Sequence, residues 1–385
     1  TLTLQDYKEL GIFSNLRIRR IRYELQKYFI KKAFKDESES DNDEAEKEQD
    51  ELALLEMDSN IEEDAPEHED GKEGEDDFGE DEDTDEYDRH IIIHEWGHYF
   101  EDKLSRADSI GGPHSLSDRL DFRVAFGEGW GNAISAMVTD DIFYRDSFES
   151  QQSQGWWSNI NNNNTTNAGW FNEGSVQSIL YDIYDDDSEA RDNIALGLGP
   201  IYSVLTDTDY RNQPYFTSIY TFINKLKSQQ PQSANAIDSL LINQNIGGTG
   251  DDGLNETNDG NIPSALPVYK SIIVGGAPIQ VCSVNDAGNL NKLGNRVFIT
   301  FQITSSGSYT FTATESGAAT QSDPEILIFH NGRYILNSTV EKVGQETITT
   351  NLSSTGTYQM EIYDWNNADD TANAGNYCFD VQISN

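Results

Sequence analysis

The sequence is poor in positive charge. Its 385 residues include 26 Lys and Arg against 68 Asp and Glu, so the formal net charge is −42. A surface with this balance repels phosphate groups, which excludes nucleic acid as a partner. The sequence also lacks an apolar run long enough to cross a membrane, and it lacks a secretory signal peptide. We therefore expect no membrane span. We also expect that residue 1 is the first residue of a processed product.

Histidine is also scarce, with six residues in the chain, yet two of them lie four residues apart in IIIHEWGHYFED, residues 91–102. On a helix this spacing puts His94 and His98 on one face, where both imidazoles can bind a single ion. Glu95 lies just beside that face. The pattern H-E-x-x-H predicts a zinc site in which Glu95 acts as general base. The alternative is a chance pairing of two surface histidines, but the apolar residues on either side favour a buried helix.

A catalytic zinc ion usually has a third protein ligand. The candidate is Glu128 in VAFGEGWGNAISAM, residues 124–137, which predicts a second helix. Asn132 follows one turn later on the same face, where it can orient a ligating histidine through the ring nitrogen that does not bind the metal. In the alternative interpretation, Glu128 only interacts with the dipole at the start of its helix. The other carboxylates near the motif lie among loop residues and are poorer candidates: Asp102, Asp108, Asp118 and Asp121.

The motifs HEWGH, GEGWGNA and NEGSVQSILYDIYD resemble those of the fungalysin group of thermolysin-like metallopeptidases, which are gluzincins. The resemblance covers about residues 85–241. It implies that His94, His98 and Glu128 are the zinc ligands and that Glu95 deprotonates the attacking water.

The sequence departs from the fungalysin pattern in three places. That family generally has an aspartate at the position of Asn132. It also has a histidine that stabilises the oxyanion, where this chain reads Phe171-Asn172-Glu173. We expect Tyr181 to take that role, with Asn172 and His114 as alternatives. The region ahead of the zinc helix is also too short for the usual sheet whose edge strand binds substrate.

Composition predicts a multidomain chain. Residues 1–35 form a basic arm with nine Lys and Arg. Residues 36–88 hold 29 acids and two lysines, and such a segment is expected to be disordered. Residues 89–246 show helical periodicity and predict a mainly α, zincin-like catalytic domain built on the H-E-x-x-H helix and the Glu128 helix. Trp156, Trp157 and Trp170 either line a substrate cleft or pack in the core.

Residues 247–263 are rich in turn-forming residues and predict a linker. The linker carries oxygen-bearing side chains that are candidate calcium ligands, although their spacing does not match an EF-hand loop. These are Asp251, Asp252, Asn255 and Asp259.

From residue 264 to residue 385 the apolar period changes to two, in strands such as RVFITFQI and TYQMEIYDW. This pattern predicts a small antiparallel β-sandwich. The strands GTYQMEIYD and DPEILIF resemble those of the bacterial pre-peptidase C-terminal domain, a module often appended to secreted peptidases. That resemblance implies a non-catalytic accessory role, in substrate or surface binding, or removal on maturation.

The chain has only two cysteines, Cys282 and Cys378, near the first and last strands of the predicted sandwich. Because those strands often neighbour each other, we expect a disulfide, with two reduced core thiols as the alternative. A disulfide would indicate an oxidising, extracellular location.

These features predict a secreted, monomeric zinc endopeptidase that acts on protein or peptide substrates. Two other hypotheses remain open. One is a secreted zincin-like binding protein with weak or no catalysis, and the other is an adhesion protein that depends on calcium.

Overall fold

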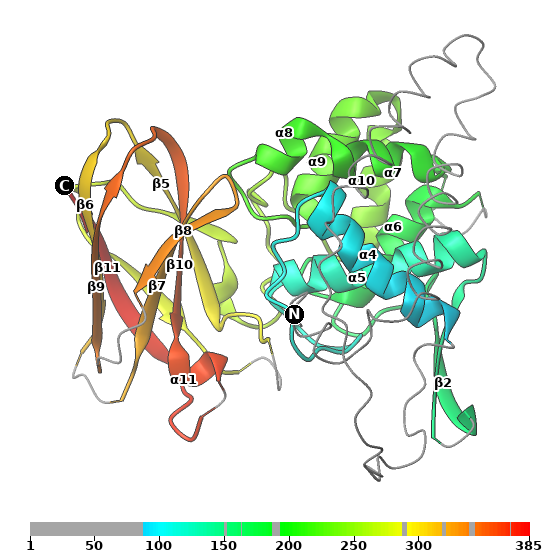
Figure 1. The fold of residues 1–385 in the computed structure, drawn as a ribbon, viewed down its shortest axis with the longest axis horizontal. Helices are drawn as coiled ribbons and strands as arrows, with labels where there is room; N and C mark the ends of the chain where they lie inside the picture. Colours follow the sequence, from blue (N-terminus) through cyan, green and yellow to red (C-terminus); the bar gives the residue numbers. More distant parts are fainter. Residues whose placement is uncertain are drawn as a thin grey trace, which may run out of the picture.

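The computed structural model describes residues 88–385 except 150–151, 163, 187–192, 287–290, 318–320, 339–342 and 370. The predicted basic arm, residues 1–35, and all but the last residue of the predicted acidic segment, residues 36–88, lie outside the described residues. The described chain forms a helical unit followed by a β-sandwich, and the two units lie side by side (Figure 1). The expectation of a multidomain chain that ends in a sandwich is confirmed.

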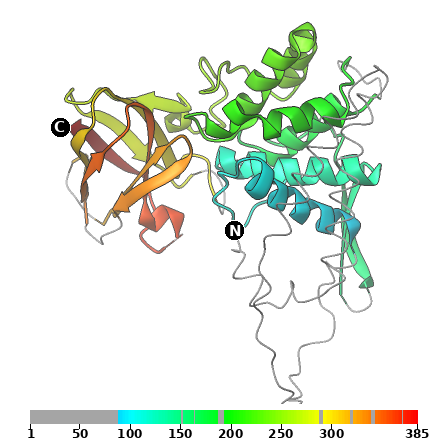
Figure 2. The same ribbon diagram turned by 45° about the horizontal axis from the view of Figure 1, so that its top comes forward.

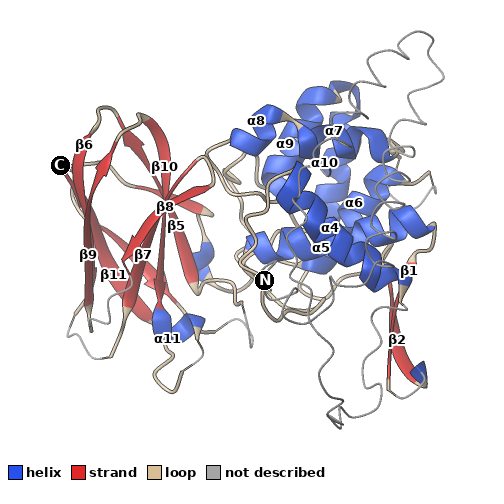
Figure 3. Ribbon diagram, viewed as in Figure 1, coloured by secondary structure: helices blue, strands red, loops and turns tan. Residues whose placement is uncertain are grey.

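The helical unit contains the first half of the described chain (Figure 3). Its elements are α4 (Arg89–Leu104), α5 (Phe122–Thr139), β1 (Phe143–Phe148), β2 (Gln154–Asn159), α6 (Glu173–Tyr184), α7 (Leu198–Thr206), α8 (Thr208–Asn212), α9 (Ile219–Gln229), the 3-10 turn η3 (Pro231–Ser233) and α10 (Ala234–Asn243).

Helix α5 is the centre of the helical unit, because it is buried along its whole length from Phe122 to Val138. Small residues let its neighbours approach closely. A Cβ atom on Gly129 would lie 2.6 Å from Val176 of α6, and one on Gly97 of α4 would lie 2.8 Å from Ile134 of α5. Glycine at such positions brings backbones closer than other residues allow. The sequence GEGWG therefore packs α4 and α6 tightly against α5.

Strands β1 and β2 form an antiparallel ribbon that projects beyond the helices (Figure 3). Trp156 and Trp157 of β2 are exposed, whereas Trp170 is buried in the core of the helical unit. The sequence left open whether these three tryptophans line a substrate cleft or pack in the core. Trp170 packs in the core.

Residues 247–263 pack against the helical unit. The carboxylate of Glu256 accepts hydrogen bonds from the backbone N–H groups of residues 247, 248, 257 and 258 and from the hydroxyl group of Tyr220. Ile262 is buried in the core of the helical unit. Among the residues that the structure describes, the carboxylates of Asp251, Asp252 and Asp259 do not form a group of three converging donors, and calcium binding stays a prediction.

The sandwich has one five-stranded and one four-stranded sheet, with strand orders β3-β5-β10-β7-β8 and β4-β11-β6-β9. Its elements are the 3-10 turn η4 (Pro263–Ala265), β3 (Tyr269–Ser271), β4 (Ile279–Ser283), β5 (Arg296–Ile303), β6 (Gly307–Glu315), β7 (Pro324–His330), β8 (Arg333–Ser338), β9 (Gln345–Leu352), β10 (Gly356–Asp364), α11 (Trp365–Ala368) and β11 (Tyr377–Ser384).

The inner faces of the two sheets bury a core that includes Phe301, Phe311, Met360 and Phe379. The sequence predicted a wholly antiparallel sandwich. This detail is wrong, because β3 pairs with β5 in parallel. The chain passes from β3 to β4 in the other sheet and returns in β5, so β3 and β5 run in the same direction.

Cys282 of β4 and Cys378 of β11 face each other across a strand pair and form a disulfide. The predicted disulfide is confirmed. It joins residues that are 96 positions apart in the sequence.

The two units share an aromatic boundary. The ring of Phe122, at the start of α5, lies 4.8 Å from that of Phe298 in β5, and the ring of Phe216 lies 4.9 Å from that of Phe329 in β7. The core of the helical unit therefore continues into the sandwich. The turned view of Figure 2 shows the two units next to each other. None of the described helices is both long enough and apolar enough to cross a membrane.

Candidate metal centre

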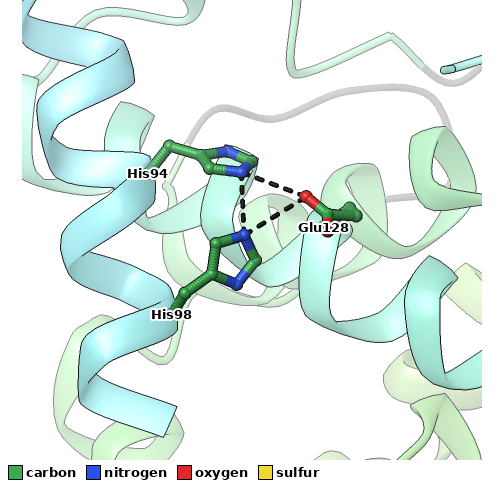
Figure 4. Close-up of side chains that lie close together, drawn as sticks. All are labelled: His94, His98 and Glu128. Carbon is green, nitrogen blue, oxygen red and sulfur yellow. Dashed lines mark hydrogen bonds and ion pairs between the residues drawn. The ribbon is translucent and has the colours of Figure 1, made fainter. Parts of the chain in front are cut away.

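Helix α4 presents two imidazoles on one face, one turn apart (Figure 4). The Nε2 atoms of His94 and His98 lie 3.0 Å apart. Glu128 reaches the same point from α5, where its Oε2 atom lies 3.1 Å from Nε2 of His94 and 3.2 Å from Nε2 of His98. Among the described residues, these three side chains form the single group of three or more potential metal ligands with donor atoms within 4.8 Å of one another.

The spacing of the three donor atoms fits a zinc ion. Ligand atoms at 2.0–2.1 Å from a tetrahedral zinc ion lie about 3.3 Å from one another. Two neutral imidazole nitrogens and a carboxylate oxygen would also repel each other at these distances, because each directs a lone pair at the same point. A positive charge, from a metal ion or from protons, is therefore required between them.

Asn132 sets the orientation of His94. The Nδ1–H group of His94 donates to Oδ1 of Asn132 at 2.9 Å, and the amide nitrogen of Asn132 donates to Oε1 of Gln177 on α6 at 3.0 Å. Gln177 therefore keeps the carbonyl oxygen of Asn132 turned towards the ring. With its proton on Nδ1, neutral His94 carries its lone pair on Nε2, which is the atom that faces Glu128.

Glu101 takes the corresponding place beside His98. Its Oε2 atom lies 3.6 Å from Nδ1 of His98, and its side chain is buried. Although burial lowers the pKa of His98, the nearby carboxylates of Glu101 and Glu128 raise it well above its ordinary value. The sequence interpretation missed Glu101. Its position three residues after His98, on the same face of the helix, is the signal that could have found it.

His114 connects the candidate metal ligand Glu128 with Glu173, the first residue of α6. Its Nε2 atom lies 3.1 Å from Oε2 of Glu128, and its Nδ1 atom lies 2.6 Å from Oε2 of Glu173. Although burial lowers the pKa of His114, the hydrogen bonds to these two carboxylates raise it to about 10. Both ring nitrogens of His114 therefore face a carboxylate, and its side chain keeps 30% of its surface exposed.

The other two candidates for oxyanion stabilisation lie elsewhere. Tyr181 is buried in the core of the helical unit, with its ring 5.7 Å from that of Tyr184. Asn172 caps α6 by accepting a hydrogen bond from the backbone of Ser175. The contacts to Glu128 and Glu173 favour His114 for this role, and the role of Tyr181 stays a prediction.

Glu95 is exposed on the turn of α4 between the two histidines. The ribbon β1–β2 borders the same region, because the ring of Tyr144 lies 6.0 Å from that of His94 and stacks on Trp156 at 5.8 Å. The exposed tryptophans of the ribbon are thus linked to a candidate ligand through one tyrosine.

Comparison with protein families gives a match that overlaps most of the helical unit. Residues 74–238 match the Mycolysin C-terminal domain, which covers less than half of the chain. The matched region includes His94, His98 and Glu128. No curated protein matches the chain.

Solved structures similar to the chain share little sequence with it. One is the pre-peptidase C-terminal domain of a collagenase from Bacillus anthracis, with 11% identity, a TM-score of 0.23 and coverage of 30% of this chain and 93% of that chain. A second is CorA, a surface-associated copper-binding protein of Methylomicrobium album BG8, with 10% identity, a TM-score of 0.22 and coverage of 30% and 98%.

A third is a carbohydrate-binding module of lichenase 5A from Cellvibrio mixtus, with 17% identity, a TM-score of 0.16 and coverage of 28% and 72%. TM-scores this low carry no argument about the fold or function of this chain.

Proposed function

We propose that this chain is a secreted, zinc-dependent endopeptidase of the gluzincin type, which acts on proteins or peptides. The observation that carries the proposal is the convergence of His94, His98 and Glu128, whose donor atoms lie 3.0–3.2 Å apart. The match of residues 74–238 to the Mycolysin C-terminal domain supports a relationship to secreted peptidases. The disulfide between Cys282 and Cys378 supports an oxidising, extracellular location.

Zinc held by these ligands would supply an acidified water molecule and a Lewis acid for the substrate carbonyl. Glu95 is exposed beside the ligand face, where its carboxylate accepts the proton of the attacking water and later donates it to the leaving amine. Asn132 and Glu101 hold the two histidines with their Nε2 atoms directed at Glu128.

His114 supplies the second charge in this mechanism. Its Nε2 atom points at the carboxylate of Glu128, and although burial lowers the pKa of the ring, the hydrogen bonds to Glu128 and Glu173 raise it to about 10. A positive charge in this position would stabilise the negative charge that develops on the carbonyl oxygen during attack through its field, because both ring nitrogens already face carboxylates. Glu173 holds the ring in place from the other side.

The test is proteolysis of casein by the purified chain, with and without phenanthroline, together with elemental analysis for zinc. The proposal expects zinc at one equivalent per chain and cleavage that stops with the chelator. Zinc at one equivalent without cleavage would instead support a zinc-binding protein without catalysis. Absence of zinc would refute both.

A further inference from the structure

The segment that joins the two ligand-bearing helices has no helix of its own. Residues 105–121 run from the end of α4 to the start of α5, with an isolated bridge at Leu120 as their sole strand-like pairing. This connecting segment carries His114. Its conformation therefore depends on hydrogen bonds to other parts of the molecule.

Asn291 of the sandwich makes two of these hydrogen bonds. Its side-chain amide donates to the backbone oxygens of Gly111 and Pro113, both at 2.9 Å. The amide also packs against Gly112, where an added Cβ atom would lie 3.1 Å from its nitrogen. One side chain of the sandwich therefore holds the three residues that directly precede His114.

Asn172 of the helical unit holds the residues that follow His114. Its amide donates to the backbone oxygens of Leu116 and Asp118, both at 2.9 Å. His114 thus lies between two asparagine clamps, and the sandwich supplies one of them. Neither clamp can replace the other, because they hold opposite sides of the residue.

The backbone of the sandwich continues the contact up to α5. The N–H group of Leu293 donates to the carbonyl oxygen of Arg119 at 2.8 Å, and the N–H group of Asp121 donates to that of Asn291 at 2.7 Å. The sandwich therefore contacts the connecting segment both before His114, at residues 111–113, and near its end, at Arg119 and Asp121.

A buried ion pair fixes the first turn of α5 to strand β10. The guanidinium group of Arg123 lies 2.8 Å from Glu361 of β10 and 2.8 Å from Asp121, the residue that caps α5. Arg123 and Glu361 are both almost fully buried. Buried charges of this kind tolerate little displacement, because separation would leave each without its partner. The helix that carries Glu128 is therefore anchored to the sandwich at its start.

We propose that the β-sandwich completes the metal centre, with Asn291 as a positioning residue that holds His114 against Glu128. This role goes beyond the accessory role, or the removal on maturation, that the resemblance implied, and both of those stay predictions. The positioning of His114 by Asn291 is argued from the contacts alone, whereas its effect on catalysis rests on the proposed function.

The first test is local hydrogen exchange in Asn291→Asp and Asn291→Gly variants of the full chain. Both residues tolerate the positive φ of 42° at this position. We expect the backbone amides of residues 111–121 to exchange about tenfold faster in both variants, while those of α4 stay unchanged. Unchanged exchange in this segment would overturn the proposal, whether or not the protein is active.

The matched control is Asn366→Asp. Asn366 also donates from its side chain to a backbone oxygen, that of Gln321, but this bond lies within the sandwich. This variant should leave exchange in residues 111–121 unaltered. Equal acceleration in both variants would show a general loss of sandwich stability and refute a specific role of Asn291.

The second test is a double-mutant cycle between Asn291→Asp and His114→Ala, measured as casein hydrolysis with zinc content held equal. We expect Asn291→Asp to lower the rate about 10- to 100-fold in the native background and to have little further effect when His114 is absent. Independent, additive losses would contradict positioning through His114. An inactive native chain would instead refute the proposed function and leave the hydrogen-exchange test decisive for the clamp.

Discussion

Gly131 of α5 lies directly beneath the ring of His94. A Cβ atom at this position would be 2.7 Å from Cε1 of the ring, which is closer than any real contact allows. The candidate metal centre therefore needs glycine here, in the middle of a buried helix where glycine is a poor helix former.

We predict that Gly131→Ala weakens zinc binding although alanine favours the helix. The new methyl group displaces His94 from Asn132 and from the other two ligands, and we expect at least about a tenfold loss in affinity. Competition with a zinc indicator measures the affinity, and circular dichroism checks that α5 is retained. Native affinity in a folded variant would show that the ring has room to move.

Glu95→Gln should separate metal binding from chemistry. Glu95 is exposed beside the ligand face, so the variant keeps its zinc while casein hydrolysis falls by about 10²- to 10⁴-fold. Asp102→Asn is a matched control, because Asp102 is an exposed acid on the same helix that contacts only Lys103 among the ion pairs described. A fully active Glu95→Gln enzyme would refute the role of Glu95 as base.

Substitutions of Asn132 should change the zinc affinity in both directions, because Asn132 orients His94. Asn132→Leu removes the acceptor at 2.9 Å from Nδ1 of His94, and zinc affinity should fall about 10- to 100-fold. Asn132→Asp offers the ring a charged acceptor, and we expect affinity to rise a few-fold relative to the native chain. Dialysis against chelator buffers gives both values. If both variants bound zinc as the native chain does, the contact would have no part in metal binding.

The ion pairs of Glu361 predict loss of stability in acid. Although burial raises the pKa of Glu361, the charges of Arg123 and Arg296 lower it to about 2, below its ordinary value of 4.5. A lowered folded-state pKa stabilises the fold above the ordinary value, and the contribution is lost as the pH falls from about 5 to 2. It amounts to about 3 kcal/mol at neutral pH.

The measurement is the free energy of unfolding in urea between pH 7 and pH 3, for the native chain and for Glu361→Gln. The variant should start less stable, because it leaves the buried Arg123 with fewer charged partners, and it should lose less stability on acidification. Parallel curves for the two proteins would show that Glu361 does not titrate as its environment implies.

Much of the candidate metal centre was predictable from short stretches of sequence. The spacing of His94 and His98 is a property of one helix, and the position of Asn132 one turn beyond Glu128 is a property of another. The alternation of apolar residues after residue 264 likewise indicated strands, because a sheet with one buried face imposes a period of two. Each of these signals depends on neighbours within about ten residues.

The contacts of His114 were not predictable in the same way. His114 lies in a segment without periodicity, and its partner Glu173 is 59 residues away, on a helix whose crossing with α5 depends on Gly129 and Val176. Tyr181 looked the better oxyanion donor because it lies on a helix near a recognisable motif. The packing turns that tyrosine into the core instead.

The sequence by itself determined that two imidazoles share a helix face, that a glutamate lies beside them and that the chain ends in paired strands, because helix and strand periods are local. Only the tertiary structure decided that His114 contacts Glu128 and Glu173, and that Asn291 and Glu361 of the sandwich hold the segments that bring these groups together. Such contacts join residues up to 238 positions apart, and their partners are chosen by how buried surfaces pack rather than by any spacing along the chain.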